Sequence, residues 1–286
     1  MVAVVYCAYG DESRDESRKR VYAVAGVFGN QVEWDEIEIP WKERLGGKIF
    51  HAADCEFGHG EFAGMPHGEC RKLYRDLTAL VVNSKLCFHG VTIDFKEYFE
   101  SFVDDFEDAP YLWAFGDVVQ SMAELASLSI PPQKLADITF DNNEPIEHNA
   151  TVLYNFMRHS PKVNARSYLA DKLSFACRRT TGIQIADLIA RETMKHLDAR
   201  LSNSMRPTRL SFAALHDTKR FAFIQLGKTD FEKRKQRLAS MSVPGATLTD
   251  YRIWLNKNRL QDCMTNRIEH LKLVSAQMHK PEQRDS

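Results

Sequence analysis

Runs of apolar residues alternate with polar turns along much of the chain and predict a series of strands and helices. Val2 to Tyr9 is apolar at every position, which indicates a strand covered on both faces, as in layered α/β proteins. Gly10-Asp11-Glu12-Ser13 follows, so we expect the strand to end there and to place two carboxylates at the rim of a sheet. A charged turn without function is the alternative interpretation.

The next apolar run, Val21 to Phe28, predicts a second strand that forms an antiparallel hairpin with the first. Three further runs predict strands, and a fourth run fits either a strand or a helix. The three are Leu86 to Phe95, Leu135 to Asp141 and Lys172 to Ala176, and the ambiguous one is Phe221 to Leu226.

Apolar residues recur at helical spacing in the segments between and after these strands. The predicted helices cover 33–45, 69–83, 111–128, 145–159, 183–197 and 251–278. A glycine-rich loop is expected from Gly58 to Gly68, and the segment Phe99 to Phe106 has no clear pattern.

Asp187 is the most informative polar residue of the chain. Apolar residues cover nearly the whole circumference of the helix around it, which predicts that its carboxylate is buried. A buried carboxylate without a partner costs several kcal/mol. Its partner is either a protein donor such as Arg191 or a metal ion shared with other acids. Gln184, one turn earlier, shares its face and is a candidate substrate contact.

Asp141 closes a predicted strand in the same way, although an Asx-turn or a helix cap would explain it equally well. Together with Asp11 and Asp187 it forms an oxygen-only ligand set, which suits Mg²⁺ or Mn²⁺ rather than zinc. A fourth oxygen ligand is expected, and the candidates are Glu12, Asp54, Glu124 and Glu192.

His51 precedes Asp54 in the stretch Phe50-His51-Ala52-Ala53-Asp54 and is a candidate for moving a proton or contacting a phosphate, or else a structural histidine. Charge is unevenly distributed, with a net charge of +8 over 201–286 and −9 over 1–200. Basic side chains could contact phosphates. The candidates are Arg178, Arg179, Lys233, Arg234, Lys235 and Arg237, and solvated helix faces are the alternative.

Several of these segments resemble one known family. They are Tyr9-Gly10-Asp11-Glu12-Ser13, Tyr22-Ala23-Val24-Ala25-Gly26-Val27, Phe50-His51-Ala52-Ala53-Asp54, Ile138-Thr139-Phe140-Asp141 and Gly182-Ile183-Gln184-Ile185-Ala186-Asp187-Leu188. The chain is similar to the family catalogued as domain of unknown function 3800, of the ribonuclease H-like superfamily, over roughly residues 2–197. Arg14 departs from the pattern, in which glycine commonly follows Asp-Glu-Ser.

The resemblance implies an α/β fold with a ribonuclease H-like mixed sheet flanked by helices over 1–200, and we expect a basic, mostly helical extension over 201–286. It also implies metal-dependent hydrolysis of nucleic-acid phosphodiester bonds. Asp11, Asp141, Asp187 and His51 are then the catalytic residues, Glu12 and Asp54 are further metal ligands, and Ser13, Gln184, Arg178 and Arg179 contact substrate. A catalytically silent module that binds nucleic acid or a partner protein remains open, as does a hydrolase of small phosphate esters.

The six cysteines form no CxxC pair and no zinc-type cluster with histidine. We also expect no signal peptide, and no apolar run of the printed sequence reaches membrane-spanning length. We therefore expect a reduced cytoplasmic protein with nucleic acid, rather than a membrane, as its partner.

Overall fold

Six strands form one mixed sheet in the computed structural model, which describes residues 4–17, 20–101, 109–129, 132–159, 163–202 and 207–240. The strands are β1 (Tyr6–Arg14), β2 (Val21–Asn30), β3 (Cys87–Asp94), β4 (Asp137–Asp141), β5 (Leu173–Ala176) and β6 (Phe221–Leu226), in the order β5-β4-β1-β2-β3-β6. β1, β2 and β3 are antiparallel neighbours, whereas β4, β5 and β6 each run parallel to the strand they join. The predicted mixed sheet is confirmed.

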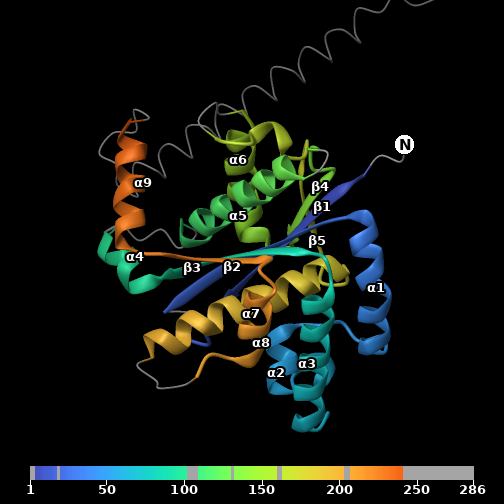
Figure 1. Ribbon diagram of the computed structural model, residues 1–286. Coiled ribbons are helices and arrows are strands. Elements are labelled where there is room, and N and C mark those ends of the chain that lie inside the picture. The colour runs from blue at the N-terminus through green and yellow to red at the C-terminus, as the bar shows by residue number, and fades with distance from the viewer. Residues whose placement is uncertain are drawn as a thin grey trace, which may run out of the picture.

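Helices cover both faces of this sheet (Figure 1). One layer consists of α5 (Ala109–Leu128) and α6 (Glu144–His159). The other contains α1 (Gln31–Leu45), α2 (Ala52–Phe57), α3 (His67–Asn83), α7 (Thr181–Leu201) and α8 (Leu210–Asp217). The short helix α4 (Phe95–Ser101) packs against α9 (Lys228–Ser240) beside the β3–β6 edge, and two 3₁₀ turns span Gly60–Phe62 and Arg166–Tyr168.

Each face of the sheet has its own hydrophobic core because side chains alternate along the strands. Ala8 and Val24 point towards α5, whereas Cys7 and Ala25 belong to the core beneath α7. This two-sided burial explains why the strand sequences are continuous apolar runs rather than alternating ones.

The sequence prediction for the end of β1 was wrong. β1 does not end at Gly10 but continues to Arg14, because residues 10–14 pair with Gly26 to Tyr22 of β2. Residues 52–57, to which the sequence analysis assigned no element, form the helix α2, and the left-handed Gly58 ends it. Asp11, Glu12 and Ser13 therefore lie inside a strand, and Asp54 lies on a helix.

The predicted C-terminal extension contributes to the sheet, since β6 pairs with β3 and resolves the ambiguity of Phe221 to Leu226 in favour of a strand. The division at residue 200 stays a prediction. The predicted helix over 251–278 and most of the segment Phe99 to Phe106 lie outside the described residues. None of the helices in the described part of the chain has the length and apolar character needed to cross a membrane.

Candidate acidic site

The register of the sheet brings Asp11 and Asp141 together. β1 and β4 run in parallel with Gly10 opposite Phe140, so the two aspartates that follow are neighbours across the strands. Gly10 is required at this close approach, because a Cβ atom there would lie 2.2 Å from the Phe140 ring. The Phe140 side chain packs in the α5 core, so alternation directs Asp141 towards the α7 face.

Helix α7 places Asp187 over the same part of β1. Gly182, in its first turn, packs directly against the Tyr9 ring. Asp187 is buried as the sequence predicted, and its Oδ2 accepts a hydrogen bond of 2.7 Å from the Ala52 backbone N–H. The predicted alternative partner, Arg191, instead binds Glu56, at 2.7 Å.

Asp11 is buried beside the charges of the two other aspartates. Burial raises the pKa of Asp11 well above its usual range, and the charges of Asp187 and Asp141 raise it further. Burial also raises the pKa of Asp187, against the opposing effects of His51 and the Ala52 N–H. Asp11 is only 4% exposed, and no Lys, Arg or His of the described residues forms an ion pair with it.

Arg178 is the nearest guanidinium to this cluster. It follows β5, and its Nε donates to Asp141 Oδ2 at 3.3 Å. Asp141, Asp11 and Asp187 all raise the Arg178 pKa, although burial opposes them as the largest single influence. Its side chain is 52% exposed, so one partly solvated cation faces three buried carboxylates.

The other predicted site residues divide into two groups. His51 adjoins Asp187 and its Nδ1 lies 2.9 Å from Asp54 Oδ2, although the pair is not aligned for a hydrogen bond. Ser13 follows Asp11 on the same face of β1, and Arg179 is exposed in the turn before α7. Gln184 has a structural position: its amide oxygen accepts from Trp41 and Phe50, and its amide nitrogen donates to the Arg178 carbonyl.

The candidates for a fourth ligand lie away from the three aspartates. Glu12 points to the opposite face of β1, where Asn143 Nδ2 donates to it at 2.6 Å. Glu192 is held by Tyr74 and Arg209, and Glu124 lies on α5 bound to Gln120. Asp54 contacts His51 rather than the cluster. The roles of Asn143 and the Ala52 N–H could not be predicted from the sequence, because both depend on tertiary contacts.

The three aspartates have the right chemistry for a divalent cation. Mg²⁺ and Mn²⁺ prefer carboxylate oxygens as ligands, and the single Arg178 guanidinium does not balance three carboxylates. Their present arrangement is not a complete ligand set: within the described ranges, no three His, Cys, Asp or Glu side chains are grouped to hold a metal. The Arg178 guanidinium and the Ala52 N–H each occupy an oxygen that a cation would need.

A scan of the sequence against protein-family models finds no match, and neither does a search of curated proteins. Among solved structures the chain is similar to a chain of the PCNA:RNase HII complex from Archaeoglobus fulgidus. The TM-score is 0.39 and the identity 9%, over 75% of this chain and 87% of that chain. At this score, function has to be argued from the chain's own residues.

Proposed function

We propose that Asp11, Asp141 and Asp187 bind Mg²⁺ or Mn²⁺ and that the protein hydrolyses nucleic-acid phosphodiester bonds. The observation that carries this proposal is the burial of three neighbouring carboxylates for which Arg178 is the one direct cationic partner among the described residues. Such an arrangement is costly unless a cation joins it, because like charges in a buried site repel strongly. Membership of the family of domain of unknown function 3800 is part of the same proposal.

A divalent cation held there would supply an activated water and stabilise charge on the leaving oxygen. The chain's own residues have separate tasks. Arg178, partly exposed beside Asp141, would leave that carboxylate and bind a substrate phosphate. His51, beside Asp187 and in contact with Asp54, would hold or transfer a proton.

The exposed Arg178 and Arg179, which follow each other in the turn before α7, favour a polyanionic substrate over a small ester. Neither residue reads a base, so we propose cleavage without strong sequence preference.

A catalytically silent module is the second candidate, and the Arg178–Asp141 ion pair favours it. In that case the arginine would be the permanent counter-ion of the cluster. The two candidates differ in whether the purified protein binds Mn²⁺ at a site that depends on Asp11.

The test combines metal binding with cleavage. Calorimetric titration with Mn²⁺ and incubation with labelled DNA, RNA and hybrid duplexes would compare the native protein with Asp11→Asn. Asp217→Asn is the matched control, because Asp217 is exposed at the end of α8. We expect one Asp11-dependent metal site and a loss of cleavage of at least about a hundredfold in Asp11→Asn only. Metal binding without cleavage of any substrate would contradict the nuclease, and no metal binding would leave the silent module.

A further inference from the structure

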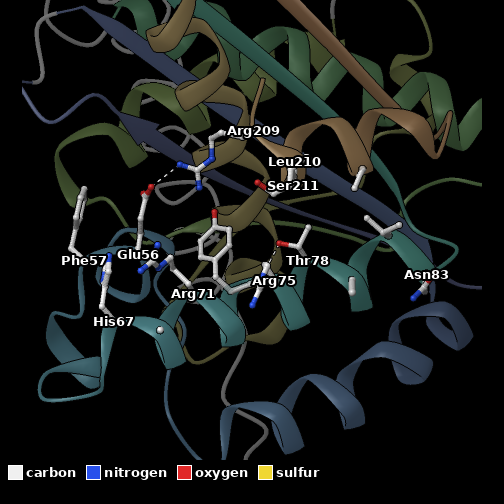
Figure 2. Close-up of a pocket in the computed structure, with 15 residues that line it drawn as sticks. Glu56, Phe57, His67, Arg71, Arg75, Thr78, Asn83, Arg209, Leu210 and Ser211 are labelled. Atoms are coloured by element: carbon white, nitrogen blue, oxygen red, sulfur yellow. Dashed lines mark hydrogen bonds and ion pairs between the residues drawn. The ribbon is translucent and has the colours of Figure 1, made fainter. Parts of the chain in front are cut away.

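A cavity of about 1050 Å³ lies between α2, α3 and α8, away from the three aspartates. Figure 2 shows Arg209, Leu210 and Ser211 on one side of it and Arg71, Arg75 and Thr78 on α3 on the other. Its volume is in the range of pockets that hold small organic ligands. None of the predicted catalytic residues lines it.

The inner wall of the cavity is a network of charged groups that neutralise one another. Arg209 binds Glu56 at 2.6 Å and Glu192 at 2.9 Å, and Arg191 binds Glu56 at 2.7 Å. The Tyr74 hydroxyl donates to Glu192 at 2.7 Å. Two arginines thus balance two glutamates, and the network ties α2, α3, α7 and the start of α8 together, so the cavity walls are preorganised.

The outer wall carries positive charge that no acid of the described residues pairs with. Arg71 and Arg75 lie one turn apart on α3, both exposed, and neither has a carboxylate partner in the described part of the chain. His67 lies one further turn back on the same face. The acid nearest in sequence, Asp76, is bound to Arg44 at 2.7 Å and does not line the cavity.

Apolar surface is exposed beside these charges. Leu210 is 86% exposed and Phe57 43% exposed, and Ala79 and Val82 continue the apolar lining along α3. An apolar wall beside two unpaired arginines is complementary to a ligand with a flat or apolar body and a doubly charged head. Guanidinium groups recognise phosphate in particular through paired hydrogen bonds.

We propose that this cavity binds a phosphate-bearing nucleotide unit, with its phosphate between Arg71 and Arg75 and its base and sugar against Leu210 and Tyr74. The unit could be a free nucleotide or one residue of a single strand, since both present the same chemistry. The site does not depend on a metal or on the acidic cluster, so it stands independently of the proposed hydrolysis.

Calorimetric titration of the full chain in metal-free buffer would test the site with adenosine monophosphate, a short single-stranded oligonucleotide, inorganic phosphate and decanoate. Arg71→Gln and Arg75→Gln are the test variants. Lys72→Gln removes one charge from another face of α3 and is the matched control. Arg71 and Arg75 are exposed and have no carboxylate partner among the described residues, so their replacement should leave the melting temperature unchanged.

We expect adenosine monophosphate or the oligonucleotide to bind more tightly than inorganic phosphate. Each arginine variant should weaken this binding about tenfold, whereas Lys72→Gln should change it less than twofold. Tighter binding of the mononucleotide would identify a free nucleotide as the ligand, and tighter binding of the oligonucleotide would identify a strand. Equal losses in Lys72→Gln, preference for decanoate, or no binding of either nucleotide probe would overturn the proposal.

Discussion

Asp11 combines burial with a charge that the surrounding residues do not balance. Its pKa is raised, so the folded protein holds the Asp11 proton more tightly than the unfolded chain does. The free energy of unfolding of the metal-free protein should therefore fall as the pH rises through that raised pKa. Asp11→Asn removes this effect and should stabilise the metal-free protein at pH 8 by on the order of 1 kcal/mol or more.

Urea unfolding in the presence of a chelator would measure this difference. Below about pH 4 both proteins carry a neutral side chain at position 11, so their stabilities should converge. A variant that is less stable than the native protein at pH 8 would show that the Asp11 carboxylate is already compensated.

In the proposed metal site, Arg178 competes with the cation for Asp141. Removing the guanidinium frees the Asp141 oxygen that it contacts at 3.3 Å. Arg178→Gln should therefore bind Mn²⁺ several-fold more tightly than the native protein, measured by calorimetry. Arg179→Gln, which removes an exposed neighbouring charge, is the control. Weaker Mn²⁺ binding in Arg178→Gln would refute the competition, whereas absence of binding in the native protein would refute the site itself.

At the scale of elements, helix α7 packs closely against strand β1 at Gly182. A Cβ atom on Gly182 would lie 2.3 Å from the Tyr9 ring, whose other neighbour is Trp34. Gly182→Ala should therefore destabilise the protein by about 1–3 kcal/mol, because the ring or the helix must move. Gly68→Ala is the control, since nothing lies within 4 Å of a Cβ there. Urea unfolding would measure both, and equal stabilities would show that α7 adjusts freely.

Strand β3 contains a histidine that makes the fold sensitive to acid. Burial lowers the pKa of His89 to about 4, and Ser121 Oγ lies 3.2 Å from its Nε2. The unfolded chain takes up the His89 proton near pH 6.5, whereas the folded protein does not, so stability is lost as the pH falls from 6.5 towards 4. This loss amounts to about 3 kcal/mol.

His89→Gln should lose this part of the acid sensitivity. The comparison is the change in unfolding free energy between pH 7.5 and pH 4 for the native and variant proteins. The raised pKa values of Asp11 and Asp187 increase the unfolding free energy as the pH falls over the same range. This contribution is the same in the native protein and in His89→Gln, so it cancels in the comparison. An unchanged pH dependence would mean that His89 is protonated in the folded state.

Elements could be predicted from the sequence where apolar residues form a clear pattern, as helical spacing does in α5 and a continuous apolar run does in β2. The end of β1 could not, because Gly10 to Arg14 has polar residues and is held in the sheet by pairing with β2. The short helix α2 was missed for a similar reason. It has only six residues, and its place depends on contacts with α3 and α7.

The acidic site was predicted in part. Burial of Asp187 followed from the apolar circumference of α7, but its bond to the Ala52 N–H joins residues 135 positions apart. Gln184 shares a helix face with Asp187, as predicted, yet its amide is used by Trp41, Phe50 and Arg178. The spacing of residues in the sequence predicts which face of a helix a side chain lies on. Which hydrogen bonds its polar atoms form depends on residues from other helices and strands.

At the scale of the whole molecule, residues after position 200 are part of both cores. Phe212, Leu215 and Phe221 belong to the core beneath α7, and Leu226 and Phe231 belong to the core on the α5 face. Strand β6 also covers the edge of β3, which would otherwise expose unpaired backbone groups. The first 200 residues therefore do not bury a complete core by themselves.

A protein of residues 1–200 should consequently fail to fold cooperatively. Each of the five lost apolar side chains contributes about 1.5–3 kcal/mol, a total comparable with the 5–15 kcal/mol that stabilises a typical domain. A protein of residues 1–240 retains every described contact and is the control, which should give one sharp urea transition followed by circular dichroism. A sharp transition in residues 1–200 at the same urea concentration would show instead that β6 and its helices are an appendage, as the sequence first indicated.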